Sequence, residues 1–197
     1  MSGQHHDVYA IGNALVDSEF AVTDAQLSAL GIEKRRMTLI DNEQRTALLA
    51  QMAQLGKPHP VRRTGGGSAG NTVVAVAQLG GKAFYSCKVA DDELGAFYAA
   101  DLQANGVATN LTHTHATEGQ TGNCLVFITP DAERSMSTFL GHTTTLDSSS
   151  LHAQDIAKSK VYYMEGYLAA SPSGCAAALE GRRVAKEAGA APATTLS

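Results

Sequence analysis

Apolar residues follow two different spacings along this chain, and the two spacings alternate. Short apolar runs rich in strand-forming residues predict buried strands, and longer segments with an apolar residue every three or four positions predict helices. The predicted strands cover residues 8–16, 37–40, 83–89, 123–129, 134–140 and 160–164. The predicted helices cover residues 24–30, 42–55, 69–80, 92–106, 153–158 and 172–188. Strands that alternate with helices indicate an α/β fold with a mostly parallel sheet.

One pair of strands departs from this alternation. Only Pro130-Asp131-Ala132-Glu133 separates the strands at 123–129 and 134–140, and this sequence is typical of a type I turn. Residues 19–22 predict a further short strand. We therefore expect a small second β layer beside the main sheet.

Composition narrows the class of protein. The 197 residues are 44% hydrophobic and 17% charged, which predicts one domain with a sizeable core. The formal net charge is −4, and the only basic cluster, Lys34-Arg35-Arg36, is too small to follow a phosphate backbone, so nucleic acid is excluded as a partner. The sequence shows neither the roughly 20 apolar residues of a membrane span nor a signal peptide at its start. We expect a cytoplasmic protein that does not contact a membrane.

Cysteine and histidine give no sign of a metal centre. Cys87, Cys124 and Cys175 lie far apart among apolar neighbours, which predicts free thiols rather than a disulfide or a zinc framework. The seven histidines lie in polar or loop segments without paired spacing, so none is assigned to a metal.

The most unusual stretch is the glycine run Gly65-Gly66-Gly67-Ser68-Ala69-Gly70-Asn71-Thr72. So many residues without side chains predict that another group comes close to the backbone there. Three uses of such a loop compete: a dinucleotide turn, a triphosphate cradle and a sugar-binding floor.

The dinucleotide turn fits Gly65, Gly67 and Gly70, with Asp91 or Asp92 as the ribose-binding carboxylate, so an NAD-dependent oxidoreductase stays open as an alternative. Its weakness is the preceding segment, which is short and charged where a buried central strand is needed. A triphosphate cradle would need a lysine where Asn71 stands. An amide both donates and accepts hydrogen bonds, which suits neutral hydroxyls and favours the sugar-binding floor.

Three motifs, in this order and spacing, resemble the ribokinase-like carbohydrate kinase family, also called the PfkB family. They are Ile11-Gly12-Asn13-Ala14-Leu15-Val16-Asp17, then Gly66-Gly67-Ser68-Ala69-Gly70-Asn71, then Gly80-Gly81 followed by Val89-Ala90-Asp91-Asp92-Glu93-Leu94-Gly95. Residues 121–124, 133–138 and 163–168 are most similar to its adenosine-kinase-like branch, which includes bacterial sugar kinases.

The resemblance implies a three-layer α/β/α fold with a mostly parallel central sheet and a small β lid. All of residues 1–197 would belong to one such domain, with lid strands at about 17–23, 108–114 and parts of 122–140. It also implies the transfer of the ATP γ-phosphate, with Mg²⁺, to a hydroxymethyl group of a sugar or nucleoside. A homodimer formed through the lid is a further expectation.

The positions that match the family's motifs imply an acceptor-binding site on this chain. Asp17 would accept hydrogen bonds from two adjacent hydroxyls, and Asn71 would bond a further one. Gly66 and Gly67 would let the sugar ring lie against the backbone. The remaining residues implied for the floor and the far side of the site are Asn13, Ser68, Glu165 and Tyr167.

The family's catalytic aspartate lies in a Gly-Ala-Gly-Asp motif, and no such motif occurs in the 197 residues. No catalytic residue is therefore assigned. We expect the chain to correspond to the N-terminal two thirds of a kinase, truncated before the ATP-binding half, to be inactive alone and to hold no cofactor tightly. A noncatalytic sugar-binding protein is the remaining alternative.

Overall fold

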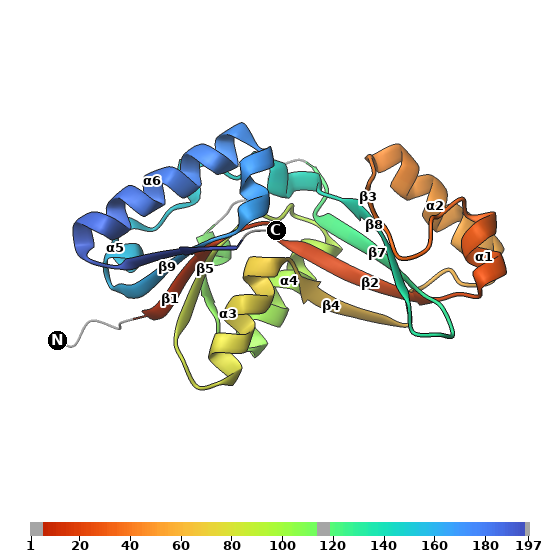
Figure 1. Ribbon diagram of the computed structural model, residues 1–197, viewed down its shortest axis with the longest axis horizontal. Helices are drawn as coiled ribbons and strands as arrows, with labels where there is room; N and C mark the ends of the chain where they lie inside the picture. Colours follow the sequence, from red (N-terminus) through yellow and green to blue (C-terminus); the bar gives the residue numbers. More distant parts are fainter. Residues whose placement is uncertain (1–5, 114–118, 196–197) are drawn as a thin grey trace.

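The computed structural model describes residues 6–113 and 119–195. Within these residues the strands form two five-stranded sheets, in the orders β10-β9-β1-β5-β6 and β3-β8-β7-β2-β4. Figure 1 shows the two sheets beside each other along the long axis of the molecule, with α1 and α2 at the far end of the second sheet.

The first sheet is parallel at every strand pair. Its strands are β1 (His6–Ile11), β5 (Ala83–Ser86), β6 (Ala108–Thr109), β9 (Ser159–Met164) and β10 (Ala191–Thr194). On β1, Val8 and Ala10 pack into one core cluster while Tyr9 and Ile11 pack into another. Both faces of this strand are therefore buried, which is the usual state of a central parallel strand.

Helices cover both faces of the first sheet. They are α3 (Ser68–Gln78) and α4 (Glu93–Ala104) on one face, and α5 (Ala153–Ala157) and α6 (Pro172–Ala188) on the other. The short 3-10 helices η1 (Asn110–His113), η2 (Gly141–Thr145), η3 (Ser148–Ser150) and η4 (Gly166–Ala170) lie in the connections. This confirms the predicted three-layer α/β/α architecture.

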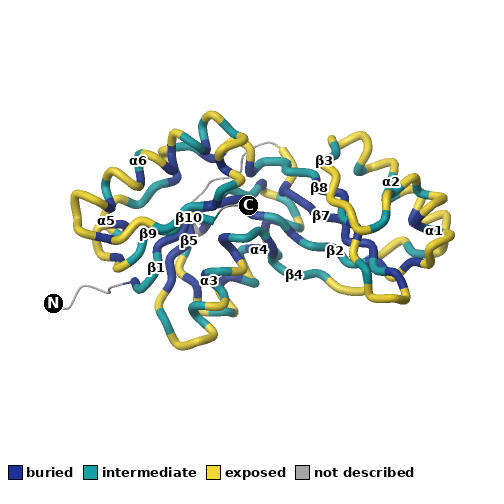
Figure 2. The backbone as a smooth tube through the Cα atoms, viewed as in Figure 1, coloured by how far each residue is buried: buried dark blue, intermediate teal, exposed yellow. Residues whose placement is uncertain are grey.

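The second sheet is mixed. Its strands are β2 (Leu15–Ala21), β3 (Met37–Leu39), β4 (Arg62–Gly66), β7 (Gly122–Ile128) and β8 (Arg134–Phe139). The β7–β8 hairpin is antiparallel, as its turn sequence predicts. The helices α1 (Asp24–Ala29) and α2 (Asn42–Gln54) bury Phe20, Met52 and Phe127 against one face, so that the helices expose their outer sides (Figure 2).

Two predictions about the strands are wrong. The apolar run at 8–16 is two strands, because the chain leaves the first sheet after Ile11 and enters the second at Leu15. Asp17 therefore lies inside β2 rather than at the end of the first strand. The stretch that begins at Ala108 pairs with β5 in the first sheet, so it is not a strand of the second sheet; residue 114 lies outside the described residues.

The polar segment before the glycine run also belongs to the second sheet, because β4 pairs antiparallel with β2. Among residues 6–113 and 119–195, every helix is too short or too polar to cross a lipid bilayer.

Candidate functional site

The glycine run lies where the chain passes from the second sheet into α3. Gly67 has a φ of +86°, and a Cβ added there would lie 2.2 Å from the carbonyl oxygen of Asn13. Both the backbone conformation and the close approach require glycine. The run therefore holds the start of α3 against the connection between β1 and β2.

At Gly66 the approaching group is the carboxylate of Asp17. A Cβ on Gly66 would lie 2.6 Å from Asp17 Oδ1, because β2 and β4 pair side by side. The predicted close approach to the glycine backbone is thus made here by an atom of the protein itself. It places Asp17 of the first motif against Gly66 of the second.

Asp17 is a half-buried carboxylate without a hydrogen-bond donor from the protein in the part of the chain that the structure describes. Burial raises its pKa, and the positive charge of Arg134 partly opposes this shift. Cys124 lies directly opposite on β7, so the two side chains share one face of the sheet. Asp17 therefore offers free acceptor oxygens on the face that α1 and α2 leave open.

A cavity of about 540 Å³ lies on this open face, between the second sheet and the turns η2 and η4. Five of the predicted site residues line it: Asn13, Gly67, Ser68, Glu165 and Tyr167. Asp17 and Gly66 lie at its border, next to the lining residues Cys124 and Gly67.

Asn71 does not line the cavity. It is exposed in the first turn of α3, three positions after the lining residue Ser68, and so shares a side of the helix with it.

The wall of the cavity is apolar and rich in sulfur. Met37 on β3 pairs with Met136 on β8, and Leu39 pairs with Thr138 beside Cys124. Partners directly opposite each other point to the same face of a sheet. Met37 and Leu39 remain 42% and 59% exposed. These residues present an apolar surface to the cavity, which Ser68 and Gly67 also line.

Glu165 and Asn13 are bonded to each other. The Asn13 backbone N–H donates to Glu165 Oε2 at 2.9 Å, and the Asn13 amide nitrogen donates to Oε1 at 3.2 Å. The Ala69 N–H donates to Oε2 at 3.4 Å. Burial raises the pKa of Glu165, and these hydrogen bonds partly offset that shift. Both carboxylate oxygens are thus already engaged within the protein.

This arrangement contradicts two of the uses considered for the glycine run. A triphosphate would need the amides at the start of α3, but the Ala69 N–H already donates to Glu165. A dinucleotide turn would need a parallel strand before the loop, but β4 is antiparallel to β2 and belongs to the second sheet. Asp92 is the N-cap of α4 and accepts hydrogen bonds from Gly95 and Thr121.

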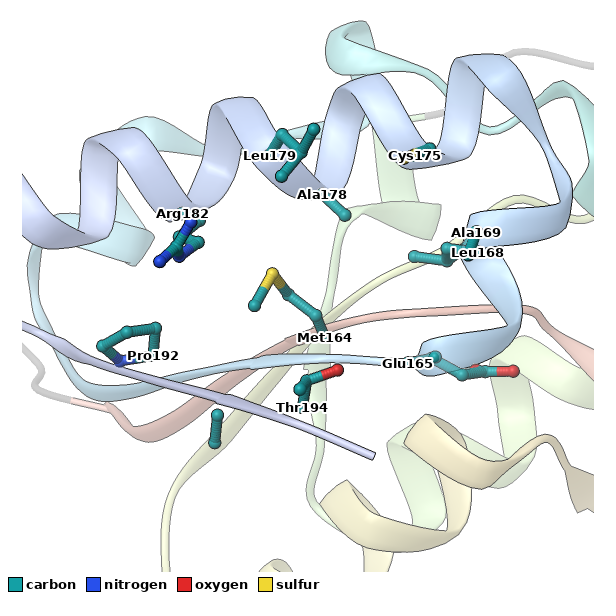
Figure 3. A pocket seen from close by; sticks show the side chains of 12 residues that line it. Met164, Glu165, Leu168, Ala169, Cys175, Ala178, Leu179, Arg182, Pro192 and Thr194 are labelled. Carbon is teal, nitrogen blue, oxygen red and sulfur yellow. The ribbon is translucent and has the colours of Figure 1, made fainter. Parts of the chain in front are cut away.

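A second cavity, of about 390 Å³, lies between α6 and the strands β9 and β10 (Figure 3). Met164, Leu179 and Arg182 line it. Of the predicted site residues only Glu165 borders it, and Figure 3 shows the Glu165 carboxylate pointing away from it. Of these two cavities, the first therefore has more of the predicted polar residues in its lining, namely Asn13, Ser68, Glu165 and Tyr167.

Comparison with known proteins matches residues 28–195 to the family described as pfkB family carbohydrate kinase. The chain belongs to this family. Its described residues have the ribokinase-like fold, and similarity extends to both sugar and nucleoside kinases. The recognition made from the three sequence motifs is confirmed.

Two solved structures are similar over nearly the whole chain. A probable sugar kinase protein from Rhizobium etli CFN 42 is 38% identical with a TM-score of 0.86, covering 98% of this chain and 56% of that one. The adenosine kinase from Sinorhizobium meliloti is also 38% identical, with a TM-score of 0.85, covering 98% of this chain and 57% of that one.

Among curated relatives, the ribokinase of Mus musculus is 29% identical over 124 residues, which are 63% of this chain and 37% of the mouse protein. The two solved structures are longer than this chain, which spans little more than half of their length.

Proposed function

We propose that this chain binds the hydroxyl-bearing acceptor of an ATP-dependent kinase, with Asp17 as the principal polar ligand. The observation that carries the proposal is the free Asp17 carboxylate at the border of the 540 Å³ cavity. A carboxylate with two free oxygens accepts hydrogen bonds from two neighbouring hydroxyls, as a sugar ring presents them. The pfkB family match supports this use of the site.

The other predicted residues take supporting roles in the proposal. Gly66 leaves room for the Asp17 carboxylate and Gly67 lines the cavity, while Ser68 and Asn71 offer polar groups from the first turn of α3. Tyr167, which is 49% exposed, closes the side of the cavity formed by η4. The second sheet serves as the lid that excludes water.

Within this function the cavity favours a nucleoside over a free sugar. A free sugar exposes hydroxyls on all sides, and these would lose water against the wall formed by Met37, Leu39 and Met136. A nucleobase presents a flat aromatic ring that packs well against thioether sulfur and leucine. The two solved structures of equal identity are an adenosine kinase and a probable sugar kinase, so the apolar wall alone carries this choice.

Among the described residues, no group of three histidine, cysteine or acidic side chains could hold a metal ion. The N-terminus of α3, which would suit a phosphate, binds the Glu165 carboxylate instead. We propose that these residues bind and shield the acceptor and do not transfer phosphate by themselves. A dimer through the second sheet and a cytoplasmic location stay predictions from the sequence.

Isothermal titration of the chain with adenosine, ribose, fructose and NADH tests the proposal. We expect saturable binding of adenosine, at least about tenfold weaker binding of ribose and fructose because the apolar wall stays uncovered, and no binding of NADH. A matched Met136→Ala variant should weaken adenosine binding and leave the ribose titration unchanged. Tighter binding of a free sugar than of adenosine would overturn the nucleoside assignment, and binding of NADH alone would overturn the acceptor site.

A further inference from the structure

The order of the strands requires the chain to cross between the two sheets. Among the described strands the crossings are β1 to β2, β4 to β5, β6 to β7 and β8 to β9. The first of these passes through Asn13, the second through Ala69 at the start of α3, and the last through Thr143 in η2. The orientation of one sheet relative to the other depends on how these segments are joined.

Asn13 has hydrogen bonds on all four of its polar groups. Its backbone N–H and its amide nitrogen donate to Glu165. Its side-chain oxygen accepts a hydrogen bond from Thr143 Oγ1 at 3.2 Å, and its carbonyl oxygen accepts one from the Tyr85 hydroxyl at 3.0 Å. Thr143 Oγ1 also accepts from the Ala14 N–H at 3.1 Å.

Glu165 joins the crossing from β4 to β5, which passes through Ala69, to this network. It follows β9 in the first sheet, and its carboxylate accepts from both Asn13 and Ala69. A Cβ on Gly12 would lie 2.2 Å from Glu165 Oε2, so the glycine makes room for the carboxylate. Glu165 is 3% exposed, Asn13 8% and Thr143 1%. Three of the crossings thus meet in one buried network at the end of the cavity.

We propose that Asn13 and Glu165 are positioning residues, whose hydrogen-bonded pair fixes the second sheet against the first and so sets the width of the cavity without bonding the acceptor. The proposal rests on the proposed function only in taking the cavity as the acceptor site. Both side chains line the cavity, yet their polar atoms face each other and the crossings. A ligand role would require them to give up these bonds.

An exchange of the amide and the carboxylate tests the pair. Asn13→Asp alone sets two buried carboxylates against each other, which should loosen the network. Adding Glu165→Gln restores a complementary pair, because the glutamine oxygen can accept from the Asn13 and Ala69 backbone amides while its NH₂ donates to the new carboxylate. If Asn13→Asp does not fold, Thr143→Val removes one arm of the network at nearly constant shape. Thr145→Val is the matched control, since Thr145 lies in the same turn, is exposed and does not reach Asn13.

Two measurements separate positioning from ligand binding. Spin labels on ketone-bearing residues at the exposed positions Gln51 in α2 and Lys186 in α6 report the distance between the sheets and leave the native cysteines in place. Titration with adenosine reports the acceptor site. The distance measurement does not need a bound acceptor, so it tests this proposal even if the chain binds no adenosine.

We expect Asn13→Asp or Thr143→Val to broaden the distance distribution and weaken adenosine binding about tenfold, as expected for an unsatisfied buried group. The exchanged pair should restore both, and Thr145→Val should change neither. A native distance distribution in Asn13→Asp or, if that variant does not fold, in Thr143→Val would overturn the proposal. A second outcome would also overturn the proposal: the unaltered chain binds adenosine, and the exchanged pair has a native distance distribution but does not bind it. Asn13 would then be a ligand.

Discussion

Removing the Asp17 carboxylate should weaken adenosine binding by about 2 to 4 kcal/mol, or roughly 30- to 900-fold in dissociation constant. The carboxylate accepts no hydrogen bond from the described part of the protein, so its oxygens are free for the acceptor. The substitutions are Asp17→Asn, which keeps one acceptor oxygen, and Asp17→Ala, which keeps none.

The magnitude follows from two opposing contributions. Two hydrogen bonds from hydroxyls to a charged carboxylate contribute about 1.5 to 3 kcal/mol each. Burial already disfavours the charged form of Asp17, as its raised pKa indicates, and covering it further with a ligand reduces the net gain. The loss should therefore fall below the sum of the two bonds, with asparagine at the lower end and alanine at the upper end.

Isothermal titration at neutral pH measures the loss, and Glu19→Gln supplies a matched control. Glu19 lies two residues further along the same face of β2, within 3.9 Å of Arg134. Its neutralisation changes the local charge without removing a cavity acceptor, so adenosine binding should change by less than about threefold. Unchanged affinity in both Asp17 variants would refute the reasoning, and an equal loss in Glu19→Gln would show that net charge alone matters.

Three further predictions concern the same region. Gly66→Ala should reduce adenosine binding by at least about tenfold in the same titration, because its methyl group would displace the Asp17 carboxylate; native affinity would show that the contact is not needed. Adenosine binding should be lost as the pH falls through the raised pKa of Asp17, which lies above the ordinary value of 3.8. The Asp17→Asn variant should lack this step in its pH profile. If both proteins show the same profile, the step belongs to another group. Tyr98→Phe should lower the free energy of unfolding in urea by about 1 to 2 kcal/mol, since the Tyr98 hydroxyl donates to the Gly66 carbonyl at 2.8 Å in the core, and an unchanged midpoint would contradict this.

Local signals made some elements predictable at residue level. Helix α6 begins and ends where the sequence predicts, because Ser171 and Pro172 favour a helix start and Gly189 takes the left-handed conformation that ends it. Thr23 and Asp41 cap α1 and α2 in the same local way. Such signals act within a few residues, so no tertiary information is needed to interpret them.

The division between the two sheets could not be predicted in this way. The run from Val8 to Val16 stays apolar across both sheets because Ala14 and Val16 are buried in the same core cluster as Val8 and Ala10, so periodicity carries no mark of the change. Strand β4 is charged and glycine-rich, and only its pairing with β2 makes it a strand. Tertiary contacts override local preference at both places.

The site shows the same limit. Motif spacing is enough to propose Asp17, Gly66 and Gly67, but it does not reveal the apolar wall, because Met37 and Met136 meet only through the register of β3 and β8, about a hundred positions apart. Thr143 was missed as well, since it lies in a polar stretch that predicts only a loop. Finding the wall requires the strand register, and finding Thr143 requires the tertiary contact between η2 and the connection from β1 to β2.

A crystal structure of this chain with adenosine tests the central claim most directly. The account predicts adenosine in the cavity between the second sheet and η4, with two ribose hydroxyls within hydrogen-bond distance of the Asp17 carboxylate and the base against Met37 and Met136. Adenosine bound in the second cavity, between α6 and the strands β9 and β10, would contradict the account, and so would adenosine bound with its ribose away from Asp17.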